Sequence, residues 1–130
     1  PIAMEVAAGI REKMQVFGDN YDTHDGTGVR DYIHVSDLAI AHMKALNYIS
    51  ENDKDLLVNL ATGEGHSVLD VINKSKEVSG KDIPFDIVGR RAGDPATVIA
   101  VSNRANKVLD WSTKYSDLDT LIRTAWDVYK

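Results

Sequence analysis

Residues 26–39 read Gly-Thr-Gly-Val-Arg-Asp-Tyr-Ile-His-Val-Ser-Asp-Leu-Ala, and the rest of the chain can be interpreted outward from this stretch. Its two glycines indicate a flexible loop, and the alternating residues 30–35 predict a strand. Ser36 or Asp37 is then placed to cap a helix that contains the apolar residues that follow. Arg30 stands where the loop joins the strand, so its backbone is anchored while its guanidinium reaches outward. Such an arginine is suited to hold a phosphate or a carboxylate through two hydrogen bonds.

The spacing of apolar residues predicts alternating helices and strands on both sides of this stretch. Helices are expected over residues 1–8, between the cap Ser67 and Gly80, from Ser102 to Leu109, and from Ser116 or Asp117 onward. Strands are expected at residues 14–17, 56–60, 84–88 and 98–101, and the nearly continuous apolar run 56–60 favours a buried parallel strand. The strands are short and scattered, so the fold class expected is a small mixed α/β domain without a complete doubly wound domain.

The composition limits the classes of function. A length of 130 residues predicts one domain, and a net charge of −5 gives no support to nucleic acid or an anionic membrane as partner. The absence of cysteine excludes disulfides, thiolate metal sites and cysteine nucleophiles. No run of about 18 apolar residues and no signal-peptide pattern occurs, so no membrane span and a cytoplasmic location are expected.

The first residues already read as part of a helix, although the chain opens on Pro1 and not on methionine. We therefore expect this chain to be the downstream piece of a longer protein. A processed mature terminus is the alternative.

A second group of cations occupies residues 90–95, which read Arg-Arg-Ala-Gly-Asp-Pro and follow a predicted strand. Two adjacent arginines repel each other unless an anion lies near them. That anion is either Asp94, in an internal salt bridge, or a ligand diphosphate, with Asp94 accepting from a sugar hydroxyl. Arg30 has a similar alternative, an ion pair with Asp31 or Asp37 on the protein surface.

The remaining polar motifs carry little chemistry. Residues 62–67 place two glycines before a helix, as a phosphate loop does, but a tight turn with Ser67 as helix cap is favoured. Tyr32 has no lysine four residues later that would lower its pKa. The histidines lack the spacing of metal ligands: His24, His34, His42 and His66. No catalytic residue and no metal ligand is therefore assigned within this chain, and Trp111 and Trp126 are expected in the core.

Several motifs resemble the UDP-galactose (UDP-glucose) 4-epimerases, which are extended short-chain dehydrogenases/reductases. The resemblance rests on the run at residues 26–39, Val-Phe-Gly at 16–18, Arg-Arg-x-Gly-Asp at 90–94 and Leu-Asp-Trp at 109–111. It implies that residues 1–130 are the UDP-sugar-binding C-terminal domain of a two-domain enzyme. It also implies these substrate contacts: Arg30 and Arg91 to the diphosphate, Asp94 to the ribose, Gln15, Val16 and Phe17 around the uridine, and Tyr32 and Val68 nearby. Val98 departs from the aromatic or cysteine that relatives often place near the sugar, which leaves the sugar preference open.

The same resemblance implies a parent enzyme that inverts C4 of UDP-glucose and UDP-galactose with NAD, as a homodimer. The motifs for that chemistry, GxxGxxG for NAD and the YxxxK of the catalytic tyrosine, do not occur in this sequence. We therefore expect the chain to bind the UDP moiety, to hold no NAD itself and to be inactive alone. The alternatives are a free-standing sugar-nucleotide-binding module and the corresponding half of a nucleotide-sugar dehydratase or decarboxylase.

Overall fold

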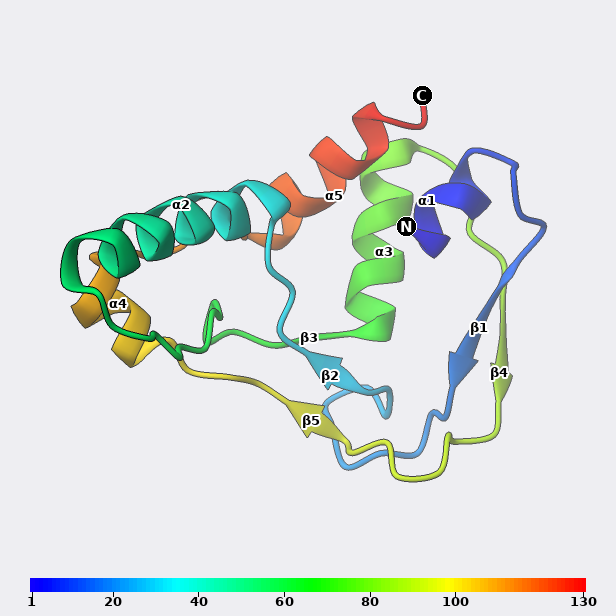
Figure 1. Ribbon diagram of the computed structural model, residues 1–130. Helices are drawn as coiled ribbons and strands as arrows, with labels where there is room; N and C mark the ends of the chain where they lie inside the picture. The colour runs from blue at the N-terminus through cyan, green and yellow to red at the C-terminus, as the bar shows by residue number, and fades with distance from the viewer.

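A computed structural model describes all 130 residues, which form five helices and five short strands (Figure 1). The helices are α1 (Ile2–Ala7), α2 (Val35–Asn52), α3 (Val68–Ser79), α4 (Asn103–Leu109) and α5 (Leu118–Asp127). The strands are β1 (Met14–Phe17), β2 (Val29–Arg30), β3 (His66–Ser67), β4 (Phe85–Val88) and β5 (Thr97–Val98). This arrangement confirms the predicted mixed α/β class. None of the helices has the length and apolar sequence that crossing a bilayer requires.

The strands form two small sheets. β1 pairs in parallel with β4, in a register that sets Met14 beside Phe85 and Phe17 beside Val88. In the other sheet β2 is the central strand, antiparallel to β3 and parallel to β5. Figure 1 shows α3 between the two sheets, with α1 beside it and α5 across its C-terminal end, while α2 and α4 extend away on the other side.

The apolar side chains form two separate buried clusters. The first joins α1, β1, α3 and α5, and its buried members are Ala3, Met4, Val6, Ala7, Val16, Ile72, Ile83 and Ile122. The second joins α2 to α4 and the segment after α4, and its buried members are Ala41, Ala105, Leu109 and Trp111. Both tryptophans pack as predicted, since Trp111 is buried in the second cluster and Trp126 lies against the first.

Helix α3 begins and ends where the sequence predicts. The Asp70 amide donates to Ser67 Oγ at 2.9 Å, and the Ser67 amide donates to Asp70 Oδ2 at 2.9 Å, which completes a capping box. At the other end Gly80 has a φ of 66°, the left-handed conformation that closes many helices. The N-terminus of α3 lies beside β2 and β3 because the Val68 amide donates to the Gly28 carbonyl at 3.2 Å and Ser67 pairs with Val29.

Two predictions around residues 26–39 were wrong in detail. The strand expected over residues 30–35 is limited to β2, which ends at Arg30 because the ladder to β3 and β5 goes no further. The Asp31 carboxylate accepts from the amides of Thr62 and Gly63 at 3.1 and 3.2 Å. Helix α2 is capped by neither Ser36 nor Asp37. His34 is the cap residue, and its Nδ1 accepts from the Ser36 amide at 3.0 Å.

The strand predicted over residues 56–60 is also absent. These residues form no ladder, because no neighbouring strand supplies the hydrogen bonds that a strand needs. Leu56, Val58 and Leu60 pack against the second buried cluster, whereas Leu57 is 81% exposed. The strand expected at residues 98–101 is likewise shorter, since only Thr97 and Val98 pair with β2.

Candidate binding site

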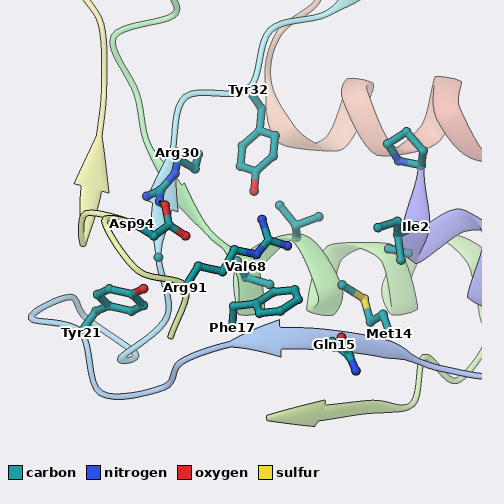
Figure 2. Close-up of a pocket in the computed structure, with 14 residues that line it drawn as sticks. Ile2, Met14, Gln15, Phe17, Tyr21, Arg30, Tyr32, Val68, Arg91 and Asp94 are labelled. Carbon is teal, nitrogen blue, oxygen red and sulfur yellow. The ribbon is translucent and has the colours of Figure 1, made fainter. Parts of the chain in front are cut away.

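A cavity of about 350 Å³ opens between β1, the segment around β2, the start of α3 and the loop that follows β4 (Figure 2). Apolar side chains make up one side of it and charged groups the other. It is lined by Pro1, Ile2, Ala3, Met14, Gln15, Phe17, Tyr21, Gly28, Arg30, Tyr32, Val68, Val71, Arg91 and Asp94. This volume lies within the range of small-molecule sites in proteins.

The cavity brings together seven of the eight substrate residues expected from the sequence. These seven are Gln15, Phe17, Arg30, Tyr32, Val68, Arg91 and Asp94. Val16 is the exception, because its side chain is only 1% exposed and belongs to the core. Successive residues of a strand point to opposite faces, so Val16 faces inward between Gln15 and Phe17. Only its backbone is left for any role in the cavity.

Arg30 on β2 is held by a network that the sequence did not reveal. Its Nη2 donates to Asp94 Oδ1 at 2.5 Å and to the carbonyl of Pro95 at 3.0 Å, and its Nη1 donates to the carbonyl of Val29 at 2.7 Å. The ion-pair partner is therefore Asp94, and neither Asp31 nor Asp37. These contacts fix the guanidinium at the wall of the cavity.

The two adjacent arginines are held apart by aromatic rings. The Cζ atom of Arg91 lies 3.7 Å from the ring centroid of Phe17, and that of Arg90 lies 4.0 Å from the ring centroid of Tyr21. Arg90 also donates from Nε to Asn20 Oδ1 at 2.8 Å. Arg91 has no salt bridge, and Asp94, which the sequence offered as its internal partner, pairs with Arg30. The Arg91 charge is therefore available to an anion in the cavity.

Tyr32 adds a neutral hydrogen-bonding group. Burial raises the pKa of its phenol, and this effect outweighs the opposing influence of the Arg30 charge. The phenol therefore keeps its proton at neutral pH. Figure 2 shows the Tyr32 hydroxyl pointing into the cavity toward Arg91.

The loop at residues 62–67 does not offer its amides to a ligand. The amides of Thr62 and Gly63 donate to the Asp31 carboxylate, and the Ser67 amide donates to Asp70. These three amides are therefore already engaged by side chains of the protein. The structure therefore supports the turn and cap interpretation of this loop.

One cluster has the residue types of a metal site. His24, Asp25 and Asp70 bring their ligand atoms within 4.8 Å of one another, a group that sequence spacing did not indicate. The carboxylates are already engaged: Asp25 Oδ1 accepts from the Thr27 amide at 2.9 Å, and Asp25 Oδ2 accepts from Ser67 Oγ. Asp70 belongs to the capping box of α3. We assign the cluster to the structural support of this loop.

Sequence reasoning missed several residues of the cavity. Tyr21 is the most important, and the signal for it was an aromatic residue in a loop otherwise rich in aspartate and glycine. The apolar wall was missed as well, because the start of α1 and Val71 on α3 come close to β1 only in the folded chain. No local pattern marks these residues.

Comparisons with known proteins show which family this chain is similar to. A family model described as GDP-mannose 4,6 dehydratase matches residues 1–125. A UDP-glucose 4-epimerase from Lacticaseibacillus casei is 46% identical over 98% of this chain. The chain spans 38% of that relative's length.

Solved structures show the same fold. The UDP-glucose-4-epimerase of Stenotrophomonas maltophila, with bound NAD and formylated UDP-arabinopyranose, matches with a TM-score of 0.91 and 46% identity. The match covers 98% of this chain and 38% of that one. The UDP-glucose 4-epimerase of Brucella ovis in complex with NAD gives a TM-score of 0.92 at 44% identity, covering 98% of this chain and 39% of that one.

Proposed function

This chain belongs to the family described as GDP-mannose 4,6 dehydratase, and we propose that it forms the UDP-sugar-binding part of a UDP-glucose 4-epimerase. An epimerase is favoured over a dehydratase or decarboxylase because relatives at 44–48% identity carry the epimerase name. The substrates proposed for the parent enzyme are UDP-glucose and UDP-galactose. A homodimeric parent and a cytoplasmic location stay predictions.

The observation that carries the proposal is the placement of two arginines on one cavity that also has an apolar side. Arg30 is fixed by its contacts, and Arg91 is stacked on Phe17 with no acidic partner. A diphosphate carries enough negative charge to be attracted by both guanidinium groups. Arg91 offers a planar set of free donors, whereas the Nη groups of Arg30 already donate within the protein, so Arg30 contributes its positive charge. We assign the diphosphate to Arg30 and Arg91.

The other residues of the cavity are proposed to contact the ribose and the uracil of the nucleotide. Asp94 uses Oδ1 for Arg30 and has no intramolecular hydrogen bond to Oδ2, so that oxygen is available to a ribose hydroxyl. Gln15, Phe17 and Val68 line the part of the cavity proposed for the uracil ring. The Tyr32 phenol, whose pKa burial raises further above neutral pH, is a further donor.

NAD does not fit the residues of this chain. The sequence has no GxxGxxG turn, and the amides of its one comparable loop are taken by Asp31 and Asp70. In the proposed parent, NAD would supply the hydride chemistry at C4 of the sugar and would be held by residues outside these 130. We therefore propose that the chain binds and orients the nucleotide and does not turn it over.

Calorimetric titration with UDP tests the proposal. We expect the unmodified chain to bind, and Arg30→Ala and Arg91→Ala to weaken binding about tenfold or more, as for other hydrogen bonds between charged groups. Arg123→Ala is the matched control, since Arg123 pairs with Asp119 on α5 and does not line the cavity. Failure of the unmodified chain to bind UDP contradicts the proposal. Turnover of UDP-galactose by this chain with added NAD contradicts its assignment as a binding part.

A further inference from the structure

The Tyr21 hydroxyl is a buried polar group without a partner. Tyr21 is only 7% exposed, and its Oη makes no hydrogen bond in the structure. An unsatisfied hydroxyl in a protein interior is costly, and most buried hydroxyls are hydrogen-bonded. The folded chain therefore supplies no hydrogen-bond partner for this hydroxyl.

The ring cannot turn outward to find that partner in solvent. The Tyr21 amide donates to the Gly26 carbonyl at 2.9 Å, which fixes the backbone of the loop. The Arg90 guanidinium covers one face of the ring. Gly18 lies close to the ring as well, since a Cβ atom on this glycine would lie 2.9 Å from Tyr21 Cε2. The hydroxyl is thus held in a fixed place.

That place is the charged side of the cavity. Tyr21 is one of the lining residues, together with Arg30, Arg91 and Asp94. Figure 2 shows its hydroxyl on the side of the ring that faces these charged groups. A phenol between two cationic side chains is best used as a donor to an anionic oxygen that those cations also attract.

We propose that Tyr21 donates a hydrogen bond from Oη to a phosphate oxygen of the bound nucleotide, beside Arg30 and Arg91. This inference rests on the proposed function and adds a neutral donor to the diphosphate site. On this view Arg90 acts through Tyr21, because its guanidinium holds the ring in place and leaves the phosphate contacts to Arg91.

Tyr21→Phe tests the inference, since it removes the hydroxyl and keeps the ring that stacks on Arg90. Calorimetric titrations with UDP and with uridine are compared for this variant, the unmodified chain and the control Tyr115→Phe, whose ring lies outside the cavity. We expect Tyr21→Phe to weaken UDP binding about tenfold and to leave uridine binding unchanged. The control binds both ligands normally.

A thermal melt without ligand separates this role from a structural one. We expect Tyr21→Phe to keep or slightly raise the melting temperature, because a buried hydroxyl without a partner has been removed. Unchanged UDP binding, an equal loss of uridine binding, or a lower melting temperature overturns the phosphate contact and leaves the proposed function standing. If the unmodified chain binds no UDP, the proposed function fails and this inference fails with it.

Discussion

Arg30 Nη2 lies 2.5 Å from Asp94 Oδ1, and this ion pair joins residues that are 64 positions apart in the sequence. It ties β2 to the loop after β4 and closes the charged side of the cavity. The pair also sets the electrostatic character of the site, because Asp94 offsets part of the positive charge that a phosphate would meet.

Replacing Asp94 by asparagine separates the two roles proposed for this side chain. Asp94→Asn removes a negative charge beside Arg30, so we expect inorganic pyrophosphate to bind several-fold more tightly. Uridine binding weakens, since the carboxylate proposed for the ribose is lost. Isothermal calorimetry with the two ligands measures both effects. Asp127→Asn is the control, because Asp127 lies on α5 and pairs with Lys130. Weaker pyrophosphate binding would show instead that Asp94 serves mainly to position Arg30.

Gly18→Ala is expected to disturb both the fold and the site. Gly18 has a φ of 89°, and an added Cβ would lie 2.6 Å from Arg90 Cγ. We expect a loss of about 1–3 kcal/mol in the free energy of unfolding and weaker UDP binding, because the arginine loop must move. Gly89→Ala is the matched control: nothing lies within 4 Å of its added Cβ. Denaturant titration and calorimetry of both variants test this, and equal stability of the two contradicts the steric argument.

One side of α2 is expected to make the chain associate with itself. Val35, Met43 and Leu46 are 73%, 68% and 68% exposed and lie on one side of the helix. Exposed apolar surface of this kind favours association and binding of apolar dyes. We expect sedimentation to depend on protein concentration, and Met43→Ser with Leu46→Ser to reduce that dependence. Ile10→Ser, at an exposed position outside α2, is the control. A chain that stays monomeric at high concentration contradicts this expectation.

Local signals were sufficient to predict much of the fold. The Ser67 cap and Gly80 defined α3 because capping depends on neighbouring residues alone. β1 and β4 were predicted from short apolar runs followed by Gly18 and Gly89. The loops near Arg30 and Arg91 stood out through their glycines, and the family resemblance predicts a nucleotide diphosphate as their ligand.

The remaining features depend on contacts between distant residues, which no local pattern carries. Asp94 pairs with Arg30 and not with its neighbours, and the orphaned hydroxyl of Tyr21 is visible only once the ring is enclosed. Residues 56–60 have the composition of a buried strand, but a strand also needs a partner beside it. Asp37 was expected to cap α2, but this helix begins before it, at Val35. Its carboxylate instead accepts a hydrogen bond from a segment much later in the sequence.

Asp37 is expected to make the stability of the chain depend on acid. Its fully buried carboxylate accepts from the amides of Lys114 and Tyr115 at 3.0 Å each and from Ser116 Oγ at 2.6 Å. Burial raises the pKa of Asp37, but the hydrogen bonds from Ser116, Tyr115 and Lys114 outweigh it and lower the pKa below 3.8. The ionised carboxylate therefore favours the folded state. This stability is complete above the pKa of the unfolded chain and is lost as the pH falls through the lower folded pKa.

We therefore expect Asp37→Asn to reduce the free energy of unfolding at pH 7 by about 1–3 kcal/mol, because an amide satisfies these three donors less well than a carboxylate does. The gap between the variant and the unmodified chain should narrow as the pH falls below about 4, where Asp37 takes up a proton in the unfolded chain while the native carboxylate is still ionised. Urea titrations between pH 7 and pH 3 measure the free energy of unfolding of the variant and of the unmodified chain. Asp55→Asn, at an exposed aspartate without hydrogen bonds to its side chain, is the control. It should leave the free energy of unfolding unchanged at each pH. A gap that stays constant across this range would mean that the ionisation of Asp37 does not contribute to folding.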